Sequence, residues 1–335
     1  MKRLQLGKLP IDLLRRTMLT GIGAHSDLVV EGPKPGLDFA TVRLGGGFLL
    51  VSADPITGAT EDIGRYAIHV SANDVATSGT RPMFAETVVL LAEGSSVEDA
   101  AGIGKQMHET ASSLSMAIVG GHTEVTPGLK KTIVVVTAFG YAKKYVSSSG
   151  AKAGDTMMMT KFAGLEGTSE IATERADLLR GVPQATLRRA ESLISQVSVV
   201  EEAVAAFATG SVHAMHDCTE GGVLGAAYEM SLASCLGFVF RRELVPVLPE
   251  TAKICEALSI DPLKLIGSGA LLLAVRKGEE IRVEKALGGM CRVTRIGNFA
   301  EGARLVVDRG GSKLAMTDAP QDELWRVFRR PPLRS

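Results

Sequence analysis

The sequence feature that most constrains the fold is an apolar segment that ends at a carboxylate. A predicted helix with a second carboxylate follows this segment. Residues Phe48–Ala53 have the composition of a buried strand, and Asp54 follows them directly. The next segment, 62–78, has apolar residues at helical spacing, and Asn73 and Asp74 fall on its apolar face. Ligands of α/β proteins bind at the carboxyl ends of strands. We therefore expect an α/β fold that brings Asp54 and Asp74 together.

Asp74 is predicted near the carboxyl end of its helix, where the helix dipole disfavours an anion by roughly 0.3–1 kcal/mol. A cation that is bound by both Asp54 and Asp74 would reverse this penalty. The pair therefore predicts a magnesium–polyphosphate site. The alternative is that Asp74 is a solvated or arginine-paired carboxylate at a helix end.

The remainder of the chain alternates strands and helices in two halves. The 335 residues exceed the size of one ordinary core, which predicts two domains. The small polar segment Val146–Asp155 marks the expected boundary, with domains at 1–150 and 151–335. Further expected strands are Met83–Leu91, Ala117–Val119, Lys131–Tyr141, Thr156–Thr160, Val212–His216, Gly237–Phe240 and Ala270–Val275, and expected helices include Val97–Leu114, Glu166–Thr173, Thr186–Ala208 and Gly221–Cys235.

Charge and cysteine content exclude several classes of protein. Lys+Arg and Asp+Glu are both 37, so no net charge attracts nucleic acid or an anionic membrane. The sequence has no apolar segment long enough for a signal peptide or a membrane span. The four cysteines lie far apart without a C-x-x-C pair, which favours reduced thiols over a disulfide framework. We expect a cytoplasmic protein that acts on small molecules.

Three glycine-bearing segments follow predicted strands and carry polar side chains. They are Gly120-Gly121-His122-Thr123, Gly164–Thr168 with Glu166 and Gly167, and Asp217–Gly222 with Glu220. Glycine lets backbone amides approach a phosphate, and a helix start adds positive potential. None matches the P-loop or the Rossmann pattern. Each could also be a plain tight turn, so these segments support a phosphate site only together with the Asp54 and Asp74 pair.

Asp38 and two histidines complete the set of candidate functional residues. Asp38 precedes a short predicted strand at Thr41–Leu44, and its alternative role is an Asx-type turn. His122 and His216 lie at strand ends, where imidazole could act in acid–base chemistry or simply pack. No histidine spacing matches a zinc site.

In order along the chain, these motifs resemble the aminoimidazole ribonucleotide synthetase (AIR synthase, PurM-like) superfamily. Within it the chain is most similar to the hydrogenase maturation protein HypE and its archaeal relatives. The matching segments span nearly the whole chain: Gly32–Ala40, Ser52–Asp54, Asp62–Gly64, Asn73–Ala76, Gly79–Pro82, Gly120–Thr123, Gly154-Asp155, Leu165–Thr168, His216–Gly222 and Asp261–Leu263.

The resemblance implies two mixed α/β domains, an amino-terminal sheet that pairs with that of a second subunit to form a barrel, and bound ATP and Mg²⁺. It implies a homodimer, an unidentified small-molecule acceptor and a maturation-protein partner as well. The residues carried over are Asp38, Asp54 and Asp74 for the metal; Asn73, Gly120, Gly121, His122, Thr123, Glu166 and Gly167 for the nucleotide; and His216, Asp217 and Glu220 for catalysis.

Two departures from HypE bear on the expected chemistry. HypE-type proteins have aspartate where this chain has His122, which removes one anion from the metal site. HypE ends in a carbamoyl-carrying cysteine, whereas this sequence ends in Ser335, so we do not expect the full HypE reaction. The expected activity is ATP- and Mg²⁺-dependent phosphorylation of a carbonyl, amide or phosphate oxygen. The alternative is a nucleotide-binding accessory protein of metallocentre maturation.

Overall fold

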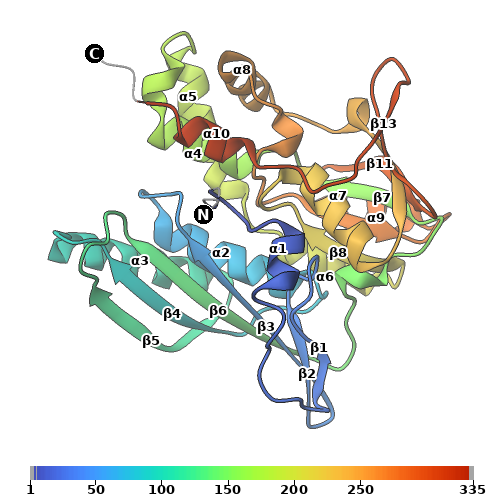
Figure 1. Cartoon of the computed structure of the whole chain (residues 1–335), viewed down its shortest axis with the longest axis horizontal. Helices are drawn as coiled ribbons and strands as arrows, with labels where there is room; N and C mark the ends of the chain where they lie inside the picture. Colours follow the sequence, from blue (N-terminus) through green and yellow to red (C-terminus); the bar gives the residue numbers. More distant parts are fainter. Residues whose placement is uncertain (1–3, 5, 332–335) are drawn as a thin grey trace.

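The computed structural model of the chain describes residue 4 and residues 6–331. Two sheets, one from each half of the chain, form the framework, and helices pack around them (Figure 1). The expected mixed α/β architecture with two domains is confirmed. No helix of the described residues is both long and apolar enough to cross a membrane.

The first sheet has six strands in the order β1-β2-β3-β6-β4-β5. Its neighbours are antiparallel except for β4 and β5, which are parallel. Helices α2 and α3 lie along one face of this sheet. The elements are β1 (Val29–Glu31), β2 (Ala40–Leu44), β3 (Gly47–Ile56), α2 (Ile63–Ala76), β4 (Phe84–Leu91), α3 (Val97–Ser113), β5 (Ala117–Val125) and β6 (Ile133–Ala142).

The second sheet has seven strands in the order β13-β12-β9-β11-β7-β10-β8. Only β12 and β9 are parallel. The strands are β7 (Thr156–Thr160), β8 (Val212–Asp217), β9 (Gly237–Arg241), β10 (Leu271–Val275), β11 (Val293–Ala300), β12 (Arg304–Val307) and β13 (Lys313–Ala315), and the helices against them are α6 (Val200–Ala208), α7 (Gly222–Ala233) and α9 (Glu280–Leu287).

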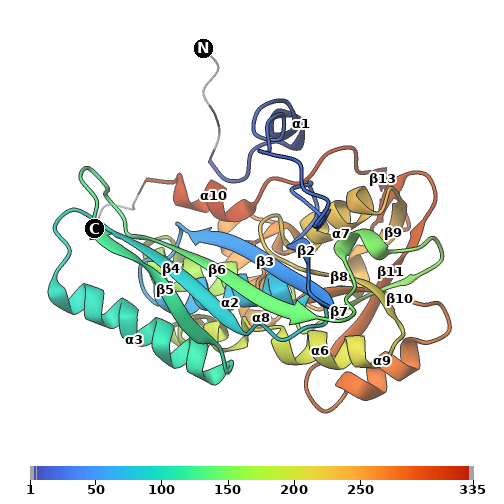
Figure 2. The same ribbon diagram turned by 90° about the horizontal axis from the view of Figure 1, so that it is seen from below.

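The central strand β10 shows why this sheet needs helices on both faces. All of its residues are buried, and successive side chains point to opposite faces. Leu271 and Leu273 join the apolar cluster of α6 and α9, whereas Leu272 joins that of α7. Figure 2 shows α7 on one side of the sheet and α6 and α9 on the other.

The two halves share one apolar core. Leu50 of β3 and Ala72 of α2 belong to the same buried cluster as Val200 of α6 and Met215 of β8. Helix α2 is therefore enclosed between the first sheet and α6. This enclosure explains why nearly every residue of α2, including Asp74, is buried.

The remaining elements pack around the second sheet or precede the first. Short helix α10 buries Leu324 and Val327 against α4 and α8. These elements are α1 (Ile11–Arg16), α4 (Leu165–Glu174), α5 (Gln184–Glu191), α8 (Pro249–Leu258), α10 (Glu323–Phe328) and the 3-10 turns η1 (Ser148–Gly150), η2 (Ala176–Leu179), η3 (Ser192–Gln196), η4 (Arg242–Leu244) and η5 (Pro262–Lys264).

Three expected elements were wrong in detail. Strand β3 continues past Ala53 to Ile56, because β6 pairs with it from Phe48 to Ile56, so Asp54 lies within the strand. The expected helix Thr186–Ala208 is broken into α5, η3 and α6. The expected turn at 120–123 is instead the middle of β5, which pairs with β4 through residue 125.

The second face of the first sheet carries apolar side chains, and no helix from the described part of the chain covers it. Val88 and Val135 are register partners at its centre, and Phe84 and Phe139 are partners nearer one end. Figure 2 shows this face towards the viewer with the helices behind or beside it. The neighbouring edge strand β5 is exposed along its whole length.

Candidate functional site

A cavity of about 1300 Å³ lies between the two halves and collects most of the predicted residues. Strand β3 and helix α2 contribute side chains from one half, and β8, α4 and α7 contribute from the other. Seven predicted residues line this site cavity: Asp38, Asp54, Asp74, Glu166, His216, Asp217 and Glu220.

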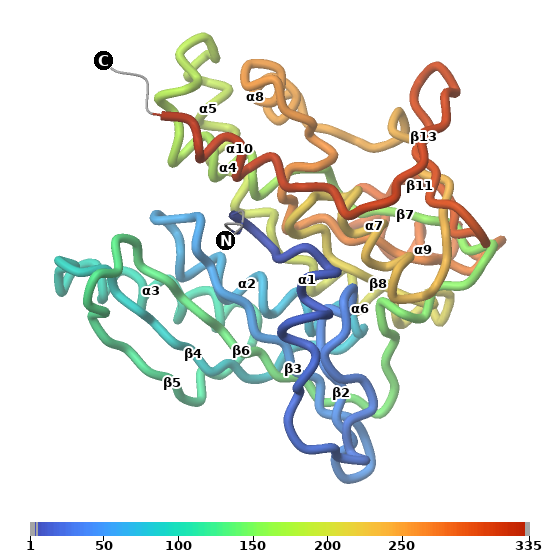
Figure 3. Tube along the Cα trace, viewed as in Figure 1, coloured from blue at the N-terminus to red at the C-terminus, as the bar shows by residue number. Residues whose placement is uncertain are grey.

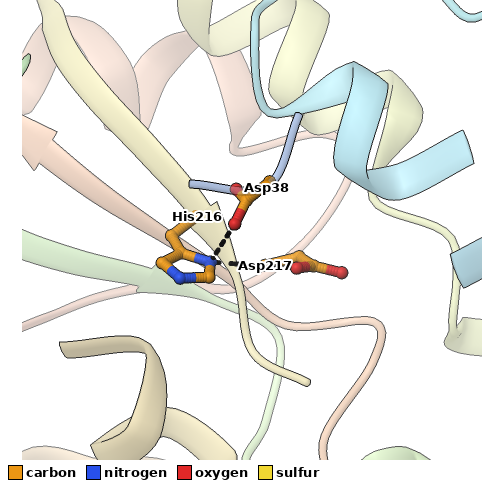
Figure 4. Close-up of side chains that lie close together, drawn as sticks. All are labelled: Asp38, His216 and Asp217. Atoms are coloured by element: carbon orange, nitrogen blue, oxygen red, sulfur yellow. Dashed lines mark ion pairs between the residues drawn. The ribbon is translucent and has the colours of Figure 1, made fainter. Parts of the chain in front are cut away.

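His216 is the centre of the polar cluster in this cavity (Figure 4). Its Nδ1 lies 2.7 Å from Oδ1 of Asp38 and 3.9 Å from Oδ1 of Asp217. On the other side of the ring, Nε2 lies 3.2 Å from Oε2 of Glu229. The imidazole is thus buried among three carboxylates from three different segments.

The charges around His216 decide its protonation. Burial by itself lowers the pKa of His216, but Asp38, Asp217 and Glu229 outweigh burial and raise the pKa well above the ordinary value. Burial by itself raises the pKa of the Glu229 carboxyl, but Lys8 and His216 outweigh burial and lower this pKa to about 2. The stable arrangement is therefore an imidazolium ion between carboxylates.

Local backbone geometry positions Asp38. Gly36 has φ +86°, and a Cβ atom there would lie 2.4 Å from the carbonyl oxygen of Glu229, so only glycine lets this loop press against α7. The hydroxyl of Ser148 donates to Oδ2 of Asp38 at 3.1 Å. Asp38 is thereby held against His216 from both sides.

The paired glycines after β8 have a packing explanation. Gly222 has φ +63°, and an added Cβ would lie 2.7 Å from the carbonyl oxygens of Leu263 and Leu265. Gly221 also has a positive φ, of +88°, at the start of α7. These glycines turn the chain sharply after Asp217 and so fix that carboxylate at the cavity wall.

Asp74 and Asp54 form a second group of carboxylates in the cavity. The hydroxyl of Ser52 donates to Oδ2 of Asp74 at 2.6 Å. Burial raises the pKa of Asp74, and the negative charges of Asp54, Asp217 and Asp38 raise it further, in that order. Asp74 therefore lies within electrostatic reach of three further aspartates, and the fold brings Asp54 and Asp74 to the same cavity.

The donor atoms fit a divalent cation. Carboxylate oxygens of Asp38 and Asp217 and a ring nitrogen of His216 lie within 4.8 Å of one another, whereas Asp54 and Asp74 are not part of this close group. Because the imidazole of His216 is protonated, the two carboxylates are the ligands that this group offers. Oδ2 of Asp217 is buried and has no hydrogen-bond partner among the described residues, although a buried carboxylate oxygen normally has one. The set around it is rich in carboxylate oxygens, the donors that Mg²⁺ prefers.

Three carboxyls that line the cavity have pKa values raised towards neutrality: Asp217, Glu166 and Asp322, the last raised by burial to about 7. Burial raises the pKa of Asp217 to about 6, since Asp38 adds to the effect and His216 only partly opposes it. Burial raises the pKa of Glu166 to about 7, although the backbone N–H of Ser268 donates to its carboxylate.

Replacing Glu166 by glutamine should stabilise the protein above pH 7. Because the folded pKa is about 7 and the ordinary value is 4.5, the unfolded chain loses this proton first, and the free energy of unfolding falls as the pH rises from about 4.5 to 7. The full shift corresponds to roughly 3 kcal/mol. We expect Glu166→Gln to flatten that decline, as measured by urea unfolding in EDTA at pH 5 and pH 8. Exposed Glu301→Gln is the matched control, and equal pH dependence in both variants would contradict the expectation.

The other predicted nucleotide residues lie outside the cavity of this chain. The carboxamide of Asn73 donates to the carbonyl of Val197 at 2.7 Å and accepts from the N–H of Val199 at 2.8 Å, so it joins α2 to the loop before α6. Gly167 packs against Leu265, whose side chain would lie 2.6 Å from an added Cβ. Residues 120–123 lie on exposed β5, where His122 pairs with Glu124 at 3.1 Å. Their nucleotide role stays a prediction.

Sequence reasoning missed Glu229 and Lys8. Glu229 lies seven residues after Gly222 and four after Gly225 on α7, so helical spacing could have placed it on the cavity face. Lys8 precedes every recognised motif and no pattern marked it. The expected carboxyl-terminal difference from HypE, Pro332–Ser335, lies outside the described residues.

Two family models match the chain, and together they cover most of it. The model for the AIR synthase related protein N-terminal domain matches residues 36–142, and that for the C-terminal domain matches residues 152–310. The chain belongs to the AIR synthase related proteins.

Relatives and solved structures agree with this family. A Methanocaldococcus jannaschii protein named for hydrogenase expression/formation is 27% identical over 283 residues, 82% of each chain. Carbamoyl dehydratase HypE of Escherichia coli is 28% identical over 267 residues, 78% of this chain and 75% of that one.

Among solved structures, one from a HypE–HypF complex has a TM-score of 0.76 at 21% identity and covers 91% of this chain and 99% of its own. A HypE in complex with ATP has a TM-score of 0.70 at 20% identity and covers 94% of this chain and 96% of its own. At these identities the structures establish a shared PurM-like fold.

Proposed function

We propose that this AIR synthase related protein binds ATP with Mg²⁺ in the site cavity and transfers the terminal phosphoryl group to an oxygen of a small molecule. The acceptor oxygen belongs to a carbonyl, an amide or a phosphate. The proposal depends above all on one observation: carboxylates from distant segments converge on one cavity and leave a buried oxygen of Asp217 without a partner.

The aspartates would hold the metal. Asp38, Asp54 and Asp74 are the ligands expected from the sequence. Of these, Asp38 lies in the close group with Asp217, whose orphaned oxygen adds a fourth candidate. When bound, Mg²⁺ supplies neutralisation of the negative charge on the phosphate oxygens.

The remaining polar residues orient and balance this site. The His216 imidazolium keeps a positive charge beside Asp38 and Asp217, where it would stabilise negative charge on the transferred group. Glu220 accepts hydrogen bonds from the backbone N–H of Lys8 at 2.7 Å and from Nε1 of Trp325 at 3.1 Å. We therefore infer that Glu220 fixes the cavity wall, whereas His216 and Asp217 face the reacting groups.

The names of solved structures with this fold support the proposal that this chain uses ATP. A solved HypE of the same fold is in complex with ATP, and a solved thiamine monophosphate kinase named AaThiL, with a TM-score of 0.71, is complexed with AMPPCP and TMP. Both proteins use this fold for an adenine nucleotide or its analogue, and the aspartate cluster gives this chain a comparable means of holding one.

A second candidate function is that of an accessory protein in metallocentre maturation that binds ATP without rapid turnover. It is favoured by the relatives named for hydrogenase expression and by the HypE–HypF complex, in which a protein of this fold assembles with a maturation partner.

Calorimetric titration of the wild-type protein with a nonhydrolysable ATP analogue, with and without Mg²⁺, tests the shared part of both functions. We expect binding only with Mg²⁺. Phosphate release measured over a panel of amides, carboxylates and phosphate esters then separates the two. Turnover with one acceptor supports the enzyme, tight binding without turnover supports the accessory protein, and no binding contradicts both.

We further propose that the protein forms a homodimer through the uncovered face of the first sheet. That face presents Val88, Val135 and Phe139 without a covering helix. A second copy would bury these side chains by completing a barrel from two sheets.

A further inference from the structure

Residues 6–8, which we call the N-terminal strap, lie along the site cavity. The residues that they contact there are far from them in the sequence. Figure 3 traces this dark blue segment alongside α10 in red. The backbone N–H of Lys8 donates to Oε1 of Glu220 at 2.7 Å, and Leu6 and Lys8 both line the cavity. Residues at the start of the chain thus complete a wall built from its second half.

Gly7 allows this close approach. Its φ is +92°, and an added Cβ atom would lie 2.4 Å from Oε1 of Glu220 and 2.6 Å from Nε1 of Trp325. A side chain at this position would both strain the backbone and displace the strap.

The strap delivers one cation to the polar cluster. Nζ of Lys8 lies 3.3 and 3.4 Å from the two carboxylate oxygens of Glu229, whose Oε2 lies 3.2 Å from Nε2 of His216. Burial by itself lowers the pKa of Lys8, but the negative charges of Glu229, Glu220 and Asp54 outweigh burial and keep the ammonium charged. Among the described lysines and arginines that line the cavity, only Lys8 is ion-paired to this network.

Stability does not explain this placement. The Lys8 side chain is 51% exposed, and half-exposed ion pairs contribute little to folding. An ammonium group has three N–H donors. The ammonium of Lys8 donates to the carboxylate of Glu229 alone, so it can still donate to a ligand in the cavity.

We propose that Lys8 is a phosphate-binding residue of this site and that its ammonium contacts the terminal phosphoryl group of the nucleotide. The inference rests on the proposed function. Lys8 lines the same cavity as Asp54, one of the expected metal ligands, and the anionic group next to the metal is the end of the triphosphate.

Binding of AMPPNP and of ADP to the full chain, each with Mg²⁺, tests this contact. Loss of one charge-assisted hydrogen bond lowers affinity roughly 10- to 100-fold. We expect Lys8→Met to lose that much affinity for AMPPNP and less than about threefold for ADP, and Lys8→Arg to recover most of the loss. Gly7→Ala should reproduce the selective loss, because it displaces the strap. Lys105→Met removes an exposed lysine of α3 and is the matched control.

The ratio of the two affinities separates a ligand contact from a structural role, since a merely loosened fold would weaken both nucleotides equally. An unchanged ratio in Lys8→Met and Gly7→Ala, with wild-type binding intact, overturns the role of Lys8 and leaves the proposed function standing. Wild-type protein that binds neither nucleotide removes the proposed function and this inference together.

Discussion

Asp54→Asn and Asp74→Asn should each abolish Mg²⁺-dependent binding of an ATP analogue. Asparagine keeps the shape of the side chain, and at position 74 it keeps an oxygen for the hydroxyl of Ser52, but it removes the negative charge that attracts the cation. Both residues line the same cavity and act on one another electrostatically. We therefore expect that neither residue can replace the other in holding the cation. Isothermal titration at fixed Mg²⁺ measures the effect.

The control for this pair is Asp27→Asn. Asp27 is almost fully exposed and pairs with His25 at the surface, so its loss should leave binding intact. Thermal unfolding without nucleotide shows that each variant is folded. Removing the buried charge of Asp74 should even raise stability, because burial disfavours its ionised form. Folded Asp54→Asn and Asp74→Asn variants with wild-type affinity would refute the metal site.

Val135→Glu should convert the proposed homodimer into a monomer. Val135 is paired with Val88 at the centre of the uncovered sheet face, so a second copy would bury the new carboxylate without a partner. An unpaired charge in an apolar interface costs several kcal/mol, which is enough to raise a micromolar dissociation constant beyond the concentrations measured. Light scattering at micromolar concentration should report half the wild-type mass.

The same substitution at Val97 is the control. Val97 is 79% exposed at the start of α3, where a carboxylate is compatible with the helix dipole, so Val97→Glu should leave the mass unchanged. Wild-type protein that is already monomeric, or a Val135→Glu variant that remains dimeric, would rule out this sheet face as the interface.

The sequence predicted those cavity residues whose positions follow from a local strand or helix pattern. The sequence pattern placed Asp54 at the end of a strand, two residues short of the actual end of β3, and Asp74 on the buried face of a helix, and their proximity followed from packing α2 against β3. The segment after β8 was predicted as a sharp turn into a helix, and the structure has it there.

Other features depended on contacts that a local pattern does not contain. Two glycines at 120 and 121 indicated a turn, but pairing with β4 extends β5 through them. Asn73 shared the face of Asp74, yet its amide matches the backbone of residues 197–199, which are distant in sequence. Lys8 reaches the site only because Glu220 and Glu229 come from the other half of the chain.

The core shared by α2, α6 and both sheets restricts how a ligand can enter and leave. Moving the halves apart as rigid bodies would expose apolar side chains such as Leu50 and Met215 to water, at about 25 cal/mol for each Å² uncovered. A hinge between the halves is therefore an expensive route for exchange. The strap, in which Leu6 is 57% exposed and the Lys8 side chain 51% exposed, uncovers much less apolar surface when it moves, so we expect the nucleotide to enter and leave past the strap.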